Sequence, residues 1–385
     1  MSKTIEPPAG ADAIRTALST ARRLVVKVGS SSLARADTGL DLERLRSLVS
    51  VLAARQAGGS EIVLVSSGAI AAGLEPLGLR RRPADMAQLQ AAAAVGQGIL
   101  VSAYTQAFAE FGIRVAQVLI TKQDLSRKSS YSNALRTFGA LTRLGVVPIV
   151  NENDTVATRE IHMGDNDHLA ALVAELVRAD ALVLLSDVDG LYTAHPSSPG
   201  AERVSYVARV ADLDVDTEQL GSSGVGSGGM TTKVEAARLA TAAGIPVVVA
   251  RWDQAGEVLS GAEVGTVFAP RAKRLSRRHG WVAHASSVKG RLHVDAGAVR
   301  ALTGTAASLL AAGIKRVEGK FAAGDSVEVV GPDGRVIARG SVGYDSAELP
   351  GMLGRNSSDA AAELGPKYSR PVVHRDDLVM GDPDR

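Results

Sequence analysis

Six short, nearly continuous aliphatic runs constrain the fold of this chain more than any other feature of its sequence. The runs are Leu24–Val28, Ile62–Val65, Val115–Ile120, Val146–Val150, Ala181–Leu185 and Pro246–Ala250. Runs that are apolar on both faces are typical of parallel strands covered on each side. The helical patterns between them are Leu42–Gln56, Met86–Phe111, Tyr131–Leu144, His168–Val177 and Thr232–Ala243. This alternation predicts an α/β fold, a three-layer sandwich around a largely parallel sheet.

With 385 residues the chain is long enough for two or three domains. We expect a loose leader over residues 1–20, the α/β domain over residues 21–270 and a basic connector over residues 271–279. The connector is typical of a solvated linker or a packing seam. Half-exposed strand patterns at 281–283, 327–330 and 335–340, with a turn at 332–334, predict a small, mostly β domain over residues 280–372. The polar tail, residues 373–385, is expected to be frayed.

The composition excludes several classes of protein. The chain has no cysteine, which rules out disulfides, thiolate metal sites and cysteine nucleophiles. A net charge of +2 and an aromatic content of 3% do not support bulk attraction to nucleic acid or to a membrane. Residues 86–109 carry no charge, but their four glutamines favour a buried helix or a subunit contact over a membrane span. These features favour a cytoplasmic enzyme.

Small polar residues or carboxylates directly follow four of the aliphatic runs. These continuations are Gly29-Ser30-Ser31, Ser66-Ser67-Gly68, Asn151-Glu152-Asn153-Asp154 and Ser186-Asp187. In a parallel sheet, ligands gather beyond the carboxyl ends of the strands. We therefore expect the four ends to form one rim of a binding site.

A glycine-rich loop, residues 228–233, opens the last helical pattern and ends in Lys233. Thr232 and Glu235 match a capping box, and N–H groups at a helix N-terminus beside a lysine can bind phosphate. A flexible surface loop is the alternative interpretation. Glycines at 224, 226 and 229 match G-x-G-x-x-G, but the acidic residues before them exclude the buried strand that a dinucleotide site needs. The chain also has no P-loop motif.

Lys27 lies inside an otherwise aliphatic run, and a buried lysine needs an anion nearby. We expect it to face phosphate, unless it is an edge-strand lysine that reaches solvent. The sequences N-E-N-D at 151–154 and G-D-N-D at 164–167 add carboxylates, although Asp165 also suits a helix cap. Two lysines, a glycine loop and several carboxylates suit phosphoryl transfer with Mg²⁺ bridging nucleotide phosphates.

Six motifs in order, at residues 24–30, 66–73, 149–154, 164–167, 186–192 and 228–233, resemble the amino acid kinase family. The resemblance extends over about residues 22–372, and the second domain looks like the PUA domain of many bacterial members. Ser66 and Ser186 stand where the family commonly has threonine, and both keep a hydroxyl.

The combination is similar to the members that transfer the γ-phosphoryl group of ATP to the γ-carboxylate of L-glutamate, the first step of proline biosynthesis. The resemblance implies Mg²⁺ bound with the nucleotide, inhibition by proline, and a homodimer or homotetramer. It assigns no protein ligand to the metal. A carboxylate is already a nucleophile at neutral pH, so no catalytic base is required.

The resemblance also implies roles for individual residues. Lys27 and Lys233 would neutralise charge on the transferring phosphoryl group, and Asp167 would hold both lysines. L-glutamate would be bound by Ser67, Asp154 and Asn166. ATP would be bound by Lys27, Ser186, Asp187, Ser227, Gly228, Gly229, Met230, Thr231, Thr232 and Lys233.

Two alternatives stay open. One is a sister enzyme of the same fold that acts on acetylglutamate, aspartate, carbamate or uridylate, although the N-E-N-D and G-D-N-D pair favours glutamate. The other is RNA binding through the second domain, with Lys289, Arg291, Lys315 and Arg316 as candidate contacts. The low aromatic content argues against the second alternative.

Overall fold

The computed structural model describes residues 9–35, 39–156, 165–213, 229–271, 288–305 and 307–380. The chain divides into two compact units. The first contains residues 1–121 and 135–274, and the second contains residues 122–134 and 275–385.

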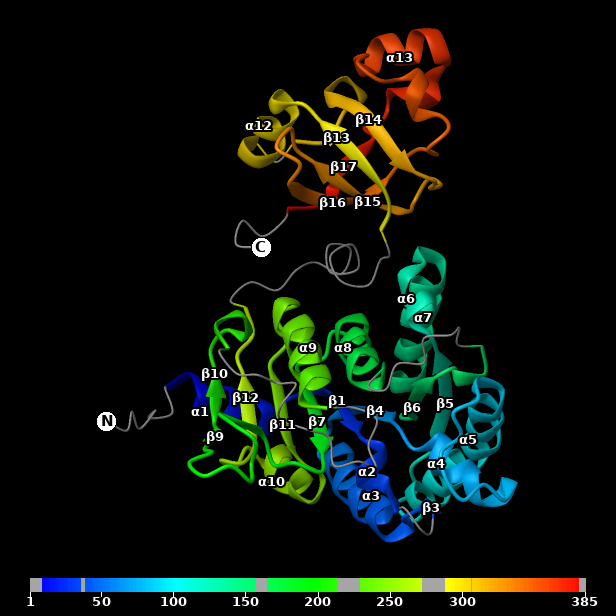
Figure 1. Cartoon of the computed structure of the whole chain (residues 1–385), viewed down its shortest axis with the longest axis vertical. Helices are drawn as coiled ribbons and strands as arrows, with labels where there is room; N and C mark the ends of the chain where they lie inside the picture. Colours follow the sequence, from blue (N-terminus) through cyan, green and yellow to red (C-terminus); the bar gives the residue numbers. More distant parts are fainter. Residues whose placement is uncertain are drawn as a thin grey trace. The chain divides into compact units, whose positions relative to one another are not determined.

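The strands of the first unit include all six of the predicted ones. Its main strands are β1 (Arg23–Val28), β4 (Glu61–Ser66), β5 (Val115–Ile120), β6 (Val147–Glu152), β7 (Ala181–Ser186), β10 (Tyr206–Val207), β11 (Val247–Arg251) and β12 (Thr266–Phe268). They form one sheet in the order β10-β12-β11-β7-β1-β4-β6-β5 (Figure 1). Only the pairing of β11 with β12 is antiparallel among the described pairs of this sheet. The prediction of a largely parallel sheet is confirmed.

Two small ribbons accompany this sheet, and helices connect its strands. The ribbons pair β2 (Ala34–Arg35) with β3 (Gly39–Leu40) and β8 (Leu191–Tyr192) with β9 (Arg203–Val204). The helices are α1 (Ala9–Ser19), α2 (Ser30–Leu33), α3 (Leu42–Ala57), α4 (Ala69–Leu74), α5 (Met86–Ala109), α6 (Lys122–Ser126), α7 (Lys128–Arg143), α8 (Asp165–Val177), α9 (Met230–Ala242) and α10 (Ala255–Ser260).

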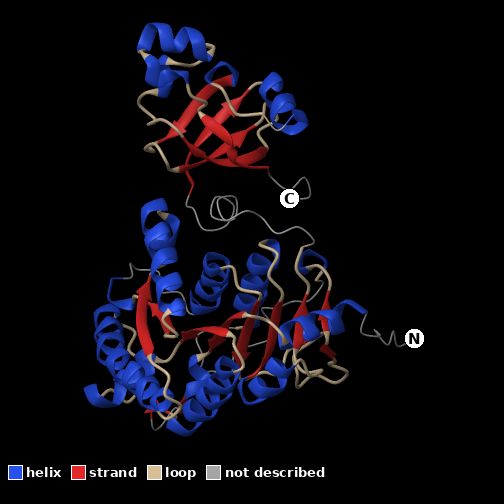
Figure 2. Cartoon of the chain, turned by 180° about the vertical axis from the view of Figure 1, so that it is seen from behind, coloured by secondary structure: helices blue, strands red, loops and turns tan. Residues whose placement is uncertain are grey.

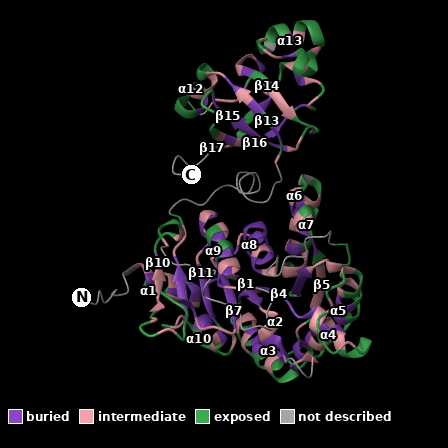
Figure 3. Cartoon of the chain, viewed as in Figure 1, coloured by how far each residue is buried: buried purple, intermediate pink, exposed green. Residues whose placement is uncertain are grey.

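The two faces of the large sheet are covered by different helices (Figures 2 and 3). Leu24, Val26 and Val28 of β1 share an apolar core with residues of α3, α5 and α10. On the other face α8 packs against β1, β4, β6 and β7, and α9 packs against α8 and β11. Side chains alternate between the faces of a strand, so Lys27 lies opposite Val26 and Val28, on the side of α8. The three-layer sandwich is confirmed.

The N-terminal segment is not loose as far as residue 20, because helix α1 covers Ala9–Ser19. Ala11 and Leu18 are buried. The guanidinium of Arg55 on α3 donates to the carbonyl oxygens of Leu18 at 3.0 Å and Ala21 at 3.1 Å. This side chain thus binds one carbonyl group in the last turn of α1 and one just after the helix ends at Ser19. The sequence expectation missed a contact between residues far apart in the chain.

The second unit contains a five-stranded sheet in the order β14-β13-β15-β16-β17. Its elements are β13 (Val288–Val294), α12 (Ala296–Thr305), β14 (Ile314–Gly319), β15 (Ser326–Val330), β16 (Val336–Val342), α13 (Ser357–Leu364) and β17 (Val373–Met380). The predicted mostly β domain and two of its strands, β15 and β16, are confirmed. The predicted strand at 281–283 lies outside the described residues.

Residues 373–380 of the predicted C-terminal tail form strand β17, where fraying was expected. Val373 and Leu378 are buried, and β17 pairs antiparallel with β16, with Gly340 opposite Leu378. The segment between them, His374 to Asp377, has the polar composition of a tail. The prediction failed because strand β16 supplies backbone hydrogen bonds to this segment, and the composition of the segment alone does not indicate a partner strand.

Helices α4 and α5 approach so closely that only glycine fits at their contact. A Cβ atom on Gly96 would lie 1.7 Å from the carbonyl oxygen of Ala69, and one on Gly73 would lie 1.9 Å from that of Ala92. Helix α5 has 24 residues and no charge. In the described part of the chain, no helix is long and apolar enough to cross a membrane.

We expect Gly96→Ala to destabilise the first unit by about 1–3 kcal/mol, because the added methyl group must push α5 away from α4. Chemical denaturation monitored by circular dichroism measures this change. Gly304→Ala on helix α12 is the matched control, since nothing lies within 4 Å of a Cβ atom there. Equal stabilities of the two variants would contradict the close contact.

Candidate active site

Four polar strand ends lie side by side, as predicted, because β7, β1, β4 and β6 are neighbours in the sheet. Lys27 is in register with Leu184 of β7 and with Val65 of β4. Val28 is in register with Ser66. The carboxyl ends of parallel strands meet at one edge, which is where ligands bind in such sheets.

The centre of this edge is the carboxylate of Asp167, in the first turn of α8. Lys27 Nζ lies 2.7 Å from its Oδ1, and Lys233 Nζ lies 3.4 Å from its Oδ2. Asp167 is fully buried, and both lysines are only 4% exposed. One buried anion thus joins two buried cations that are 206 positions apart in the sequence. Lys27 is therefore no edge-strand lysine reaching solvent.

The charges of this cluster shift the pKa values of Asp167 and Lys27. Burial raises the pKa of the Asp167 carboxyl, but the charges of Lys27 and Lys233 outweigh it and hold that pKa at about 2. Burial lowers the pKa of the Lys27 amine, with Asp167 opposing the shift and Lys233 adding to it. The cluster carries an excess of positive charge, which suits an anionic ligand.

Thr232 reaches the same carboxylate and does not cap the helix as predicted. Helix α9 begins at Met230 with Gly229 as its N-cap, so Thr232 lies inside the first turn. The Thr232 hydroxyl oxygen Oγ1 donates to Asp167 Oδ2 at 2.8 Å. The same Thr232 Oγ1 lies 2.9 Å from the carbonyl oxygen of Gly229. The capping-box prediction is wrong because a partner on α8 takes this hydroxyl.

A second cluster consists of neutral amides and a serine. Asn166 Nδ2 donates to Ser67 Oγ at 2.9 Å and to Asn151 Oδ1 at 3.0 Å. Asn151 Nδ2 donates to Gln97 Oε1 on α5 at 2.8 Å. The structure thus brings together Ser67 and Asn166, two residues predicted to bind the acceptor. It also links α8, β4, β6 and α5.

The other predicted residues that the structure describes lie just after β6, at the end of β7 and at the N-terminus of α9. Asp154 is half-buried just after β6 and lies within electrostatic reach of Arg82. Ser186 Oγ donates to Asp187 Oδ1 at 2.9 Å at the end of β7, and the Asp187 carboxylate acts on Lys27. Met230 is buried, and Gly229 and Thr231 are half-buried. Ser227 and Gly228 lie outside the described residues, as does Gly164 of the G-D-N-D motif.

Two polar contacts of this region were not predicted. Gln97 was read from the sequence only as a polar interruption of an uncharged helix, yet it is buried and faces Asn151. Tyr104 of the same helix is fully buried, and its hydroxyl lies 2.9 Å from Ser66 Oγ. In the sequence, the only indication of these contacts was that Gln97 and Tyr104 are polar side chains in a largely apolar helix.

The cations suggested for RNA binding in the second unit are mostly paired with carboxylates. Arg291 lies 3.0 Å from Glu328, Lys315 lies 3.3 Å from Asp295, and Arg316 lies close to Glu318. Paired cations attract phosphate less than free ones do. The expectation that the chain does not bind nucleic acid stays a prediction, and these pairs support it.

Comparisons with known proteins cover both units. A family model described as "Amino acid kinase family" matches residues 22–251, and one described as "PUA domain" matches residues 290–364. The glutamate 5-kinase of Streptomyces avermitilis is 57% identical over 373 residues, which cover 96% of this chain and 100% of that protein. The glutamate 5-kinase of Cutibacterium acnes is 56% identical over 366 residues, covering 95% of this chain and 93% of that protein.

Two solved structures resemble the chain at low sequence identity. Carbamate kinase from Giardia lamblia bound to AMP-PNP has a TM-score of 0.48 and 18% identity, with 66% of this chain and 99% of that chain covered. UMP kinase from Bacillus anthracis has a TM-score of 0.45 and 17% identity, with 66% and 97% covered.

Proposed function

This chain is a phosphotransferase of the amino acid kinase family, and we propose that it transfers the γ-phosphoryl group of ATP to the γ-carboxylate of L-glutamate. The product is L-glutamyl 5-phosphate, in the first step of proline biosynthesis. The observation that carries the proposal is the pair of buried lysines on Asp167 at the carboxyl ends of the strands. Relatives named glutamate 5-kinase, at 57% identity over nearly the whole chain, support glutamate as the acceptor. We further propose that the enzyme acts in the cytoplasm, which its cysteine-free composition supports.

In this proposal Lys27 and Lys233 stabilise the negative charge on the transferring phosphoryl group. Catalysis of phosphoryl transfer consists mainly of positioning and charge neutralisation. Asp167 keeps both ammonium groups charged and close together, and it does not contact the substrate itself. The glutamate carboxylate attacks without a base, because it is ionised at neutral pH.

The acceptor would bind at the amide cluster. Ser67 Oγ accepts a hydrogen bond from Asn166, so its own hydroxyl hydrogen remains available for a carboxylate oxygen of glutamate. The Asp154 carboxylate would pair with the α-ammonium group. The Ser67 hydroxyl would thus bind a carboxylate group of glutamate, and the Asp154 carboxylate would bind its ammonium group.

The nucleotide would lie over the N-terminus of α9, held by Ser186, Asp187 and residues 227–233. Helix N-termini favour phosphate groups through their free N–H groups. In the described residues there is no group of three acidic or histidine side chains that would hold a metal alone. A magnesium ion carried by the nucleotide needs only one or two protein carboxylates, and Asp187 suits that role; the ion would neutralise phosphate charge.

The proposed function is tested by ADP release from ATP with glutamate as the acceptor. Release that depends on glutamate supports it, and release that is the same without glutamate contradicts it. We also propose feedback inhibition by proline at or near the glutamate site. Proline should then raise the KM for glutamate in the same assay, and an unchanged rate at high proline would contradict the inhibition.

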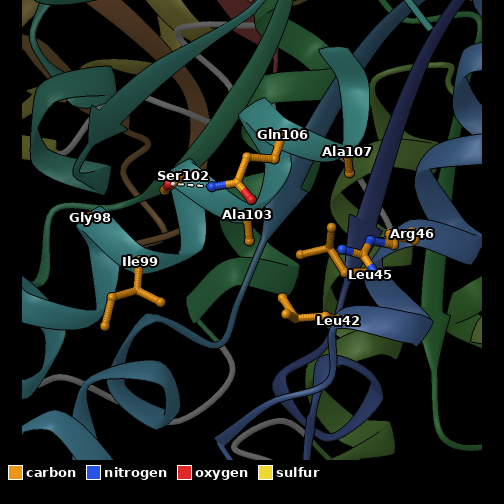
Figure 4. A pocket seen from close by; sticks show the side chains of 9 residues that line it. All are labelled: Leu42, Leu45, Arg46, Gly98, Ile99, Ser102, Ala103, Gln106 and Ala107. Atoms are coloured by element: carbon orange, nitrogen blue, oxygen red, sulfur yellow. Dashed lines mark hydrogen bonds between the residues drawn. The ribbon is translucent and has the colours of Figure 1, made fainter. Parts of the chain in front are cut away.

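We propose that two copies associate through the outer side of α5. A groove of about 390 Å³ lies between α3 and α5. The residues that line it, drawn in Figure 4, are Leu42, Leu45, Arg46, Gly98, Ile99, Ser102, Ala103, Gln106 and Ala107. Leu42 is 47% exposed and Ile99 is 37% exposed. An uncharged helix with exposed aliphatic side chains suits an isologous contact between identical subunits.

Ile99→Glu should shift the chain from a dimer or tetramer to a smaller species, because it buries an unpaired charge in the contact. Size-exclusion chromatography with light scattering measures the mass. Leu364→Glu is the matched control, since Leu364 is 41% exposed on α13 of the second unit. An unchanged mass for Ile99→Glu would exclude this surface.

A further inference from the structure

We propose that Gln97 is a positioning residue for the acceptor site, fixing the orientation of the amide cluster from helix α5. The inference rests on the proposed function, because it concerns how the phosphoryl acceptor is bound. Gln97 lies on α5, 54 positions before Asn151. Among the described residues, Gln97 makes no hydrogen bond to Lys27 or Lys233.

The orientation of the cluster is set by one backbone group. The N–H of Glu152 donates to Asn151 Oδ1 at 2.9 Å, and a backbone N–H can only donate. The other end of the Asn151 amide must therefore be Nδ2, which donates to Gln97 Oε1 at 2.8 Å. Gln97 Oε1 is therefore the acceptor for Asn151 Nδ2. If the Asn151 amide were turned by 180°, its oxygen would face Gln97 Oε1 and no hydrogen bond would form.

The same orientation determines what the cluster offers a ligand. Asn151 Oδ1 accepts from Asn166 Nδ2 at 3.0 Å, so the free end of the Asn166 amide is its carbonyl oxygen. Asn166 Nδ2 also donates to Ser67 Oγ, which leaves the hydroxyl hydrogen of Ser67 as a donor. A reversed Asn151 amide would lose the bond from Glu152 and present its NH₂ group to that of Asn166.

Burying Gln97 destabilises the fold, because one of its polar atoms has no hydrogen bond to any residue that the structure describes. Gln97 is 8% exposed, and its Nε2 is buried without a hydrogen-bond partner among the described residues. A glutamine retained only for packing would be better replaced by an apolar residue, since an unpaired buried donor destabilises the fold. The close contact of the neighbouring Gly96 with Ala69 fixes where α5, and hence Gln97, lies.

The test compares steady-state constants of the full chain with ATP and glutamate. Gln97→Met keeps the length of the side chain and its helix propensity but removes the acceptor oxygen. We expect the KM for glutamate to rise about tenfold, as for the loss of one buried hydrogen bond. The KM for ATP and kcat should change less than about twofold, because the charged cluster is untouched. Gln97→Glu keeps an acceptor for Asn151 Nδ2 and should restore most of the glutamate affinity.

Controls separate this role from packing and from the proposed function. Gln88→Leu, on an exposed position of the same helix, should leave all three constants unchanged. If thermal unfolding shows that Gln97→Met is not folded, Gln97→Ala takes its place. An unchanged KM for glutamate, or parallel changes in both KM values, would overturn the positioning role. A wild-type chain that does not phosphorylate glutamate would instead overturn the proposed function, whatever the variants do.

Discussion

Replacing Asp167 by asparagine should lower kcat/KM by about 10²–10³-fold, the scale of losing one preorganised electrostatic contact at a reacting group. The buried carboxylate is the common partner of Lys27 and Lys233. Without it, burial and repulsion from Lys233 lower the pKa of the Lys27 amine with Asp167 no longer opposing them, and the site loses positive charge. Steady-state kinetics with ATP and glutamate measure the loss.

The same substitution should change how stability depends on pH. The pKa of Asp167 is about 2 in the folded chain, below the ordinary value of 3.8. Because the folded state binds this proton more weakly, the carboxylate stabilises the fold above pH 3.8, and the contribution is lost as pH falls toward 2. Chemical denaturation at several pH values should show this loss in the wild type and a weaker one in Asp167→Asn.

Asp212→Asn is the matched control for both measurements. Asp212 pairs with Arg209 on the surface, with side chains 62% and 66% exposed. Exposed pairs contribute little, so activity and acid stability should stay near those of the wild type. If Asp167→Asn behaved like this control, Asp167 would not organise the site.

The second large effect is expected for the lysines themselves. Lys27→Met and Lys233→Met should each lose about 2–3 kcal/mol of transition-state stabilisation, mostly as a fall in kcat. Each variant leaves Asp167 one remaining lysine, so folding should suffer less than in Asp167→Asn. The double variant should lose less than the sum of the two, because both lysines act on one group.

Lys315→Met provides a control for removing one positive charge. Lys315 is 63% exposed in the second unit and pairs with Asp295. Its turnover should match the wild type. Near wild-type turnover in Lys27→Met or Lys233→Met would remove that lysine from the mechanism.

The sequence predicted the parts of the fold and site that depend on local pattern. Five of the six aliphatic runs became strands buried on both faces, which requires continuous apolar residues. The sixth, Val115–Ile120, became the edge strand β5, which is only partly buried. The polar strand ends converged because parallel strands share one edge. The residues alone predicted only that a buried Lys27 meets an anion, and the family resemblance implied that Asp167 holds it. The roles of the individual residues remain proposals.

Features that depend on distant partners were not predictable. Thr232 follows a capping pattern, but Asp167 of another helix takes its hydroxyl. The polar residues at 374–377 suggest a tail, but β16 supplies a partner strand. Gln97 looked like an interruption of an apolar helix, and only the register of β6 brings Asn151 to it.

The most direct test of the account is ATP-dependent formation of an acyl phosphate, trapped with hydroxylamine as a hydroxamate. Glutamate, aspartate and N-acetylglutamate are compared as acceptors at equal concentration, with and without ATP. We predict hydroxamate from glutamate, far less from the other two, and none without ATP. Activity with N-acetylglutamate alone would contradict the proposed substrate, and no ATP-dependent product from any acceptor would contradict phosphoryl transfer to these carboxylates.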